Sequence, residues 1–272
     1  MYPAPFCVND PVMFLSALVV AHNEESRLAA CLSRLGFCDE IVVVLDRCTD
    51  ASRDIAARFT PKLIEGAWDR EGPRRHAGID ACQGPWILEV DADEHVTPAM
   101  AQEVMALLKN PTAQRYLVPI NNYIGSRLVK QGWGASFGIR NKWCLFQKGT
   151  KHWHDQRVHP QVTYQGVAGP RLSHGIDHFV DDNIADMIAR LNRYTTAKAL
   201  DMGDTPHWTR LWPNIRRLFS RFFHCYVKRQ GYKEGVYGLC IALCAGLFPL
   251  LSYIKYQELK DQNHAAPPKK PT

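Results

Sequence analysis

The chain has 272 residues, 46% of them hydrophobic, which is enough for one substantial buried core with an appendage. Its 33 Lys and Arg residues, against 27 Asp and Glu, give a mild net charge of +6. The nine cysteines are an odd number without a Cys-x-x-Cys pair, which argues against a disulfide framework and a zinc ribbon and favours a reducing compartment.

The first 90 residues alternate apolar strands with segments of helical pattern. Residues 1–11 precede them as a leader that lacks the features of a secretory signal. Strands are expected at 15–21, 40–45, 62–64 and 86–91. Helices are expected at 24–32 with Asn23 as the N-cap, at 51–58 and at 72–82. This order predicts a mostly parallel α/β sheet flanked by helices, with a nucleotide crevice where polar residues follow the strands.

The strand at 86–91 ends in the carboxylates Asp91, Asp93 and Glu94, and Thr97-Pro98 then opens a helix. In a parallel sheet, ligands collect beyond such strand ends. Two aspartates at i and i+2 can share one hard cation, or divide between a metal and a ribose hydroxyl. The chain contains neither a Gly-x-Gly-x-x-Gly nor a Gly-x-x-x-x-Gly-Lys-Ser/Thr motif, so a dinucleotide-binding fold and a P-loop NTPase are not indicated.

Four segments in order resemble the motifs of family 2 inverting glycosyltransferases, which have the GT-A fold. They are Val19–Glu25, Asp46–Asp50, Arg74–Gly78 and Asp91–Glu94. Later segments are similar to the lipopolysaccharide-core β-1,4-glucosyltransferase-like branch of that family. These are Cys144–Phe146, Arg157–His159, Leu172–His174, Leu191–Thr195, Gly231–Gly235 and Tyr253–Tyr256.

The resemblance implies a role for each matching residue. Ala21, His22 and Glu24 would line the nucleotide pocket. Asp46 would hydrogen-bond the base, and Arg75 would lie near the base or the pyrophosphate. The family asparagine after this arginine is His76 here.

The resemblance also implies a metal-dependent site. Asp91 would face the ribose or the donor sugar, and Asp93 would bind the Mg²⁺ or Mn²⁺ that bridges the diphosphate. His174 matches a family histidine and is predicted to complete the metal shell, with a purely structural role as the alternative. A divalent cation suits this reaction because the sugar-nucleotide leaving group departs with about two negative charges.

Inversion needs a general base, because an acceptor hydroxyl is a poor nucleophile until its proton is removed. The segment 151–159 concentrates suitable groups, and Asp155 and His159 are the predicted catalytic residues. The family often has a glutamate at position 160, where this chain has proline. A zinc site is a weaker alternative, because the spacing of the nearby histidines follows no tight ligand pattern. Those histidines are His152, His154, His159, His174 and His178.

The last third of the chain favours helices at a membrane. A helical pattern at 182–200 is broken by Pro206, and 211–229 interleaves aromatic and basic residues as an amphipathic helix on anionic lipid does. The nineteen residues 236–254 carry no charge. They could just span a bilayer, lie parallel to its surface, or pack as a soluble helical subdomain.

We therefore expect a leader at 1–11, a GT-A catalytic domain at 12–205, a helical membrane-association region at 206–260 and a disordered tail at 261–272. The expected function is transfer of a hexose, glucose being the expected sugar, from a UDP-sugar to a lipid-linked saccharide in bacterial lipopolysaccharide-core or other cell-envelope glycan synthesis. The expected location is the cytoplasmic face of the inner membrane, without a nucleic-acid partner. Alternatives are a polyprenyl phosphate or peptide acceptor, a non-catalytic sugar-nucleotide-binding scaffold, and a zinc hydrolase.

Overall fold

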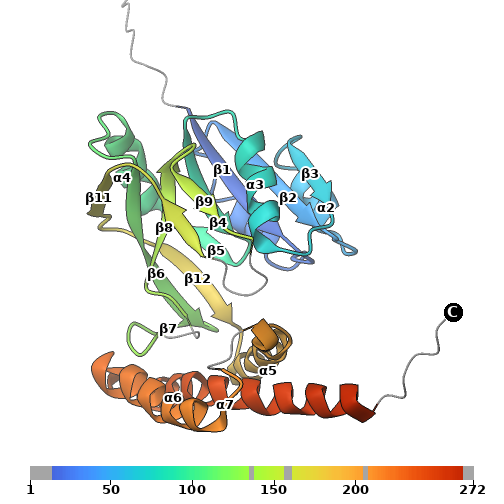
Figure 1. The fold of residues 1–272 in the computed structure, drawn as a ribbon. Coiled ribbons are helices and arrows are strands. Elements are labelled where there is room, and N and C mark those ends of the chain that lie inside the picture. Colours follow the sequence, from blue (N-terminus) through green and yellow to red (C-terminus); the bar gives the residue numbers. More distant parts are fainter. Residues whose placement is uncertain (1–13, 135–137, 156–160, 205–207, 266–272) are drawn as a thin grey trace, which may run out of the picture.

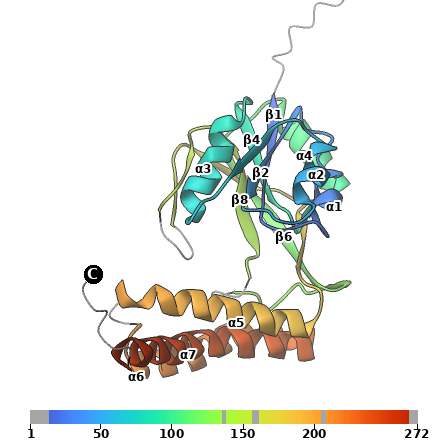
Figure 2. The ribbon, with the colours of Figure 1, turned by 90° about the vertical axis from the view of Figure 1, so that its right-hand side faces the viewer.

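The structure is a computed structural model that describes residues 14–134, 138–155, 161–204 and 208–265. An α/β part is built on one sheet, and a layer of helices from the last third of the chain lies beneath it (Figures 1 and 2). The predicted α/β class with C-terminal helices is confirmed. The predicted leader and His159 lie outside the described residues.

The amino-terminal half of the sheet is parallel, as predicted. Its strands lie in the order β3-β2-β1-β4, and Val19 of β1 sits between Val43 of β2 and Val90 of β4. The bounds are β1 Leu15–Ala21, β2 Glu40–Asp46, β3 Leu63–Gly66 and β4 Trp86–Asp91. Because the strands run the same way, the residues that follow β1, β2 and β4 meet at one edge. This carboxyl edge faces the helical layer (Figure 1).

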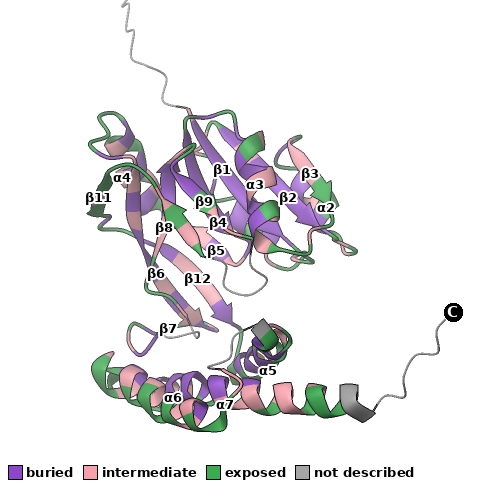
Figure 3. Ribbon diagram, in the orientation of Figure 1, coloured by how far each residue is buried: buried purple, intermediate pink, exposed green. Residues whose placement is uncertain are grey.

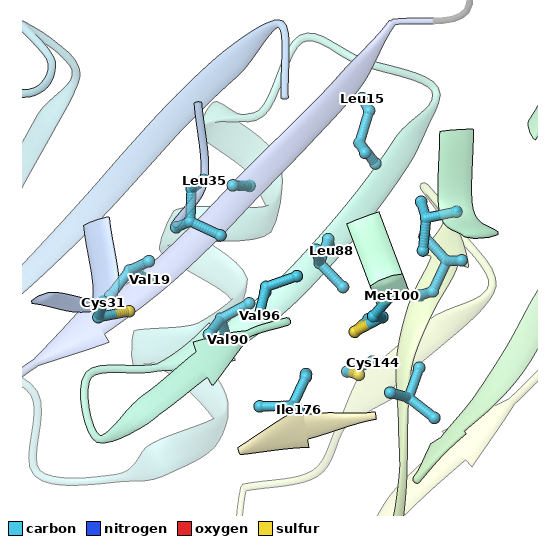
Figure 4. Packing of buried hydrophobic residues seen from close by; sticks show 14 of the residues in the cluster. Leu15, Val19, Cys31, Leu35, Leu88, Val90, Val96, Met100, Cys144 and Ile176 are labelled. Carbon is cyan, nitrogen blue, oxygen red and sulfur yellow. The ribbon is translucent and has the colours of Figure 1, made fainter. Parts of the chain in front are cut away.

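Strand β1 is buried on both faces because helices cover both sides of the sheet. Leu18 packs with Ile79 of α3 on one face. Val19 belongs to the cluster that contains Cys31 of α1 and Met100 of α4 on the other face (Figure 4). The covering helices are α1 Leu28–Leu32, α2 Ser52–Ala57, α3 Glu71–Ala81 and α4 Pro98–Leu108. The sheet is thereby the rigid frame from which the polar turns project.

The other half of the sheet is mixed. β8 is antiparallel to both β4 and β6, while β12 is parallel to β6 and antiparallel to β5. This last pairing places His178 opposite Glu94, next to the carboxyl end of β4. The bounds of the strands in this half are β5 Glu94–Val96, β6 Arg115–Ile124, β7 Arg127–Leu128, β8 Asn141–Gln147, β11 Ala168–Arg171 and β12 Ile176–Asp181. A separate two-stranded antiparallel sheet is formed by β9 Lys151–Trp153 and β10 Val162–Tyr164.

The predicted cap at Asn23 is wrong. Helix α1 begins only at Leu28, with Arg27 at its N-cap position. Asn23 adopts a left-handed backbone with φ of 56°, and its Oδ1 accepts a hydrogen bond of 2.8 Å from the Thr49 N–H. The asparagine therefore joins the turn after β1 to the turn after β2 instead of starting a helix.

Three helices and two short helical turns form the layer below the sheet. They are α5 Ile184–Leu200, α6 Leu211–Phe223, the π turn η2 His224–Lys228, the 3-10 turn η3 Gly231–Glu234 and α7 Val236–Ala265. Another 3-10 turn, η1, covers Met202–Asp204. Helix α5, which the sequence placed in the catalytic domain, packs on α7, since Met187 and Leu191 share a buried cluster with Ile241 and Phe248. Ile124 of β6 also enters this cluster, so the layer is fixed to the sheet.

Candidate active site

The turns after β1 and β2 are joined at the carboxyl edge. His22 follows buried Ala21, and its Nδ1 lies 2.6 Å from the backbone oxygen of Asp46. The N–H of Glu24 donates to the Ser52 hydroxyl at the start of α2, over 2.9 Å. The three residues predicted to line the nucleotide pocket therefore lie beside the residue predicted to contact the base.

Asp46 is buried and surrounded by donors. Its Oδ1 accepts hydrogen bonds of 3.1 Å from the Trp68 N–H and from Arg47, and its Oδ2 accepts one of 3.1 Å from Arg74. Burial opposes the charged form, but the Trp68 and Arg47 hydrogen bonds and the Arg74 charge hold the pKa of Asp46 below its ordinary value. The carboxylate thus keeps two guanidinium groups at the carboxyl edge.

Arg75 is buried among three carboxylates. Its Nε lies 2.6 Å from Glu71, its Nη1 2.9 Å from Glu89 and its Nη2 2.7 Å from Asp91. Glu89 lies inside β4 and also accepts a hydrogen bond of 2.5 Å from Lys151. The guanidinium predicted to lie near the base or pyrophosphate is therefore engaged by the protein, and it positions Asp91.

A lysine that the sequence analysis missed completes the surroundings of Asp91. The Nζ of Lys142 on β8 lies 2.6 Å from Asp91 and 2.9 Å from Glu94. Desolvation opposes the charge on Asp91, but the Arg75 and Lys142 charges hold the pKa of this carboxyl well below its usual range. Asp91 is therefore an ionised carboxylate fixed from two sides.

Asp93 lies beside a histidine, but this histidine is His178 and not the predicted His174. The Nε2 of His178 is 3.3 Å from Asp93 Oδ2. Its Nδ1 is 2.9 Å from Asn122 Oδ1, and the Asn122 amide donates over 2.6 Å to the Ile139 carbonyl. The Asn122 amide thereby turns its oxygen toward Nδ1, and Nε2 is directed at Asp93.

The electrostatics of this corner couple strand β12 and the turns after β1 and β4. Burial opposes the charge on His178, but its hydrogen bond to Asp93 and the nearby carboxylates raise its pKa. Burial, followed by the charge of Asp93, raises the pKa of Glu24, although Arg27 opposes this shift. Glu24 therefore lies within the field of Asp93, so the turns after β1 and β4 belong to one site.

His174 lies elsewhere. Its Nδ1 is 2.9 Å from Glu103 on α4, and its N–H also donates to this carboxylate. His174 precedes His178 by four residues, a separation of roughly 13 Å along an extended chain. The match to a family histidine could not show this, because it fixes the sequence position but not the pairing of β12.

Asp155 and His76 both take part in contacts between the β9 segment and α3. Asp155 forms an ion pair of 2.5 Å with Arg70, the residue that precedes α3. His76, where the family has asparagine, holds its Nε2 3.1 Å from the Trp153 carbonyl. His76 therefore anchors β9 to α3, and it holds the segment that carries the predicted base.

The side chains at Asp93 fit a divalent cation in part. No group of three or more His, Cys, Asp or Glu side chains is placed to hold a metal within the described ranges. Asp93 and His178 form an adjacent carboxylate and imidazole, and both groups suit Mn²⁺, while Mg²⁺ prefers the carboxylate. Mg²⁺ is usually held by one or two protein groups together with substrate phosphates, so a pair of ligands is sufficient.

Comparison with known proteins gives a consistent result. Residues 16–156, more than half of the chain, match the family model described as Glycosyl transferase family 2. The lipopolysaccharide core biosynthesis glycosyltransferase LpsC of Rhizobium meliloti (strain 1021) is 22% identical over 258 residues, which cover 90% of this chain and 92% of the relative. An uncharacterized glycosyltransferase of Rickettsia bellii (strain RML369-C) is 26% identical and covers 93% of this chain and 89% of its own.

Among solved structures, S. aureus TarS in complex with UDP-GlcNAc is similar over 93% of this chain and 92% of that one, with a TM-score of 0.49 and 12% identity. The match of residues 16–156 covers the parallel half of the sheet and the carboxyl edge described above. The chain therefore belongs to glycosyl transferase family 2, and its sheet with flanking helices is the GT-A fold of these enzymes.

Proposed function

We propose that this enzyme transfers a hexose, with glucose as the expected sugar, from a UDP-sugar to a lipid-linked saccharide with inversion at the anomeric carbon. The observation that carries the proposal is the convergence of Asp46, Asp91 and Asp93 at the carboxyl edge of the parallel half of the sheet. Ligands of α/β sheets bind beyond this edge, and family 2 membership makes a nucleotide-sugar the expected ligand.

The nucleotide would lie over the turns after β1 and β2. Ala21, His22 and Glu24 form one wall, and Asp46 supplies a carboxylate oxygen as acceptor for a base N–H. Asp46 also holds the Arg74 guanidinium at this edge, which places positive charge near the diphosphate. Such fixed charges stabilise a leaving group without reorganising during the reaction.

Asp91 would orient the donor sugar or ribose by accepting hydrogen bonds from its hydroxyls. Arg75 and Lys142 hold the carboxylate in place from opposite oxygens, at 2.7 and 2.6 Å. Because both cations are themselves buried, the carboxylate loses little freedom when the donor binds. In this proposal Arg75 acts by positioning Asp91.

Mg²⁺ or Mn²⁺ would be held by Asp93 and His178, with diphosphate oxygens in the remaining positions. The ion supplies Lewis-acid stabilisation of the charge on the departing UDP. The protein's own contribution is the orientation of the two ligands, through the hydrogen bond of 2.9 Å between His178 and Asn122. His178 replaces His174 in this role, because His174 is bound to Glu103.

The general base is proposed to be Asp155, with His159 as the second candidate outside the described residues. In the reaction, the acceptor oxygen forms a bond to the anomeric carbon as the bond from that carbon to UDP breaks, and the base takes the hydroxyl proton. Asp155 pairs with Arg70 here, so acceptor binding must separate this exposed pair before the carboxylate can act. Exposed ion pairs are weak enough for such an exchange, at about 0–1 kcal/mol.

The lipid-linked acceptor is supported by the helical layer. Among the described residues, one helix is long and apolar enough to cross a membrane, and this is α7 over Val236–Gln262. Placement of this layer at the cytoplasmic face of the inner membrane would bring the enzyme and an amphiphilic acceptor to one surface, which raises their effective concentration. A polyprenyl phosphate or a peptide acceptor would use the same donor chemistry.

The test is the release of UDP from a panel of UDP-sugars by purified enzyme, with EDTA, Mg²⁺ or Mn²⁺, and with or without an extract of lipid-linked saccharides. We expect release from UDP-glucose that requires the metal and the acceptor and is lost in Asp93→Asn. The matched control is Asp54→Asn, which changes an exposed aspartate on α2. A folded enzyme that releases UDP from no donor, in an extract where another transferase is active, would refute the proposed donor class.

A further inference from the structure

The helical layer carries two apolar stripes that no part of the described chain covers. On α6 and η2, the exposed residues recur every three or four positions, so they share one helix face. They are Trp212, Arg216, Phe219, Phe223 and Val227. On α7 the exposed residues recur every three or four positions up to Leu247, and the last lies two turns further on the same face. They are Val236, Leu239, Leu243, Leu247 and Ile254.

These stripes form one outer face, because the opposite side of each helix is packed. On α7, Ile241 and Phe248 are buried against α5 and the end of β6. On α6, Asn214 is buried. The two helices lie side by side in the layer below the sheet, and exposed residues line the edge of α6 away from the catalytic domain (Figure 3). The outer face therefore points away from the sheet.

Along α6 and η2 the outer face is flanked by positive charge. Between Asp204 and Glu234 the chain contains no acidic residue. The exposed cations in this interval are Arg210, Arg216, Lys228 and Lys233. Beside Arg216, Trp212 and Phe219 line an open groove of about 490 Å³. A large aromatic side chain that is 77% exposed, as Trp212 is, next to a guanidinium is typical of the boundary between acyl chains and headgroups.

We propose that the outer face docks on the surface of an anionic bilayer, with α6 and α7 lying in its plane. This inference rests on the proposed membrane location and specifies how the protein is held there. A second copy of the chain is a poor occupant, because a self-paired interface would bring these cations against one another. Anionic headgroups neutralise these cations, and the acyl chains contact the apolar stripe of α7.

Helix α7 does not cross the bilayer in this arrangement, because both ends of its uncharged segment, at Tyr237 and Lys255, are bound to the rest of the protein. Near its start, the Arg127 guanidinium of β7 lies 4.7 Å from the centre of the Tyr237 ring. Toward its end, Lys255 donates to Asn192 Oδ1 over 2.6 Å and to Thr195 over 2.9 Å, both on α5. A spanning orientation would break these contacts and leave the packed face of α7 without its partners.

The docked orientation also explains how a membrane-bound acceptor reaches the site. Strand β1 runs toward the helical layer in both views, so its carboxyl end and those of β2 and β4 face the same way (Figures 1 and 2). With the outer face on the bilayer, the carboxyl edge faces the membrane from above the helices. The saccharide of an anchored acceptor projects from that surface.

The first experiment is flotation of the full chain with vesicles of phosphatidylcholine, with or without phosphatidylglycerol. The apolar variant is Leu243→Asp with Leu247→Asp, and the charge variant is Arg216→Glu with Lys228→Glu. Met105→Asp is the matched control, since Met105 on α4 is 43% exposed and Leu243 is 47% exposed. We expect the apolar variant to bind at least about tenfold more weakly to all vesicles, and the charge variant to lose the phosphatidylglycerol dependence and its salt sensitivity.

Equal binding by the apolar variant and the Met105→Asp control would overturn the proposal. The proposal would also be overturned if the wild type formed a dimer in solution and did not bind vesicles, while the apolar variant was a monomer. Insertion is tested with a protease site after Thr272 in inverted inner-membrane vesicles. In-plane docking predicts that this site is cleaved without detergent, together with digestion of the catalytic domain. Protection of the site while the catalytic domain is digested would show that α7 spans the membrane.

The same variants separate this inference from the proposed reaction. With a detergent-dispersed acceptor, the apolar variant should release UDP at the wild-type rate, because its substitutions lie outside the site. Vesicle binding without turnover of any UDP-sugar would refute the reaction and leave the docking intact. Turnover of a UDP-sugar without vesicle binding would refute the docking and leave the proposed reaction intact.

Discussion

Replacing Lys142 by methionine should destabilise the fold through one particular carboxylate. The lysine lies between Asp91 and Glu94, and after its removal Asp91 still has Arg75 at 2.7 Å. Glu94 has no other cation within salt-bridge distance among the described residues, and its side chain is 1% exposed. Breaking a buried pair by removing one partner costs about 3–5 kcal/mol. This corresponds to a fall in Tm of roughly 6–20 °C for a domain of this size.

The source of this cost is tested by second substitutions in the Lys142→Met background. Glu94→Gln should recover about 1–3 kcal/mol, because an amide is far cheaper to bury than an unpaired carboxylate. Asp91→Asn should recover much less, since Asp91 is 33% exposed and keeps Arg75. The measurement is urea unfolding followed by circular dichroism. Strictly additive effects of the lysine and glutamate substitutions would refute the reasoning, because they would show that the two side chains are not coupled.

Three further predictions test the metal site, a buried carboxylate and the packing of α3. His178→Asn should weaken the apparent affinity for Mn²⁺ at least about tenfold in the UDP-release assay, whereas His174→Asn should leave it unchanged. Burial opposes the charge on Glu40, but hydrogen bonds from a lysine and a serine lower its pKa. Its contribution to stability is therefore complete above about pH 4.3 and is lost as pH falls through the lowered folded-state pKa, so Tm should fall less steeply below pH 4.3 in Glu40→Gln. A Cβ on Gly78 would lie 2.3 Å from a β1 leucine, so Gly78→Ala should cost about 1–3 kcal/mol in urea unfolding, while Gly36→Ala, with open space around it, should cost under about 0.5 kcal/mol. The first prediction would be contradicted if both histidine substitutions changed the Mn²⁺ affinity equally. The second would be contradicted if Tm fell equally steeply with pH in the wild type and in Glu40→Gln. The third would be contradicted if both glycine substitutions cost the same free energy of unfolding.

The parallel half of the fold was predictable because its signals are local. Strands buried on both faces are continuous apolar runs, and β1 and β4 lie where those runs stand in the sequence. The carboxyl edge follows from strand direction alone, since every parallel strand delivers its final residue to the same side. Asp46 and Asp91 could therefore be assigned to one site without knowledge of any side-chain contact.

The partners of these aspartates were not predictable, because they come from strands that pair over long distances in sequence. Lys142 reaches Asp91 only because β8 pairs with β4, and His178 reaches Asp93 only because β12 pairs with β5. The sequence does carry one weak signal, a charged residue within an apolar strand. Glu89 in β4 and Lys142 in β8 both have it, and a buried charge needs a partner. The signal shows that a partner exists and leaves its identity open.

The ion pairs that escaped prediction give the site its rigidity. Glu89 lies at the centre of β4 and binds Arg75 of α3 and Lys151 of β9, so one carboxylate fixes three elements. Asp91 lies two residues later on the same strand face, and Arg75, which is fixed by Glu89, also holds Asp91 in place. A buried ionic cluster contributes little net stability compared with apolar packing, and its value lies in fixing one arrangement. Here the fixed arrangement is that of Asp91, the carboxylate proposed to orient the donor sugar or ribose, so loss of a supporting charge should lower turnover more than it lowers the affinity for UDP.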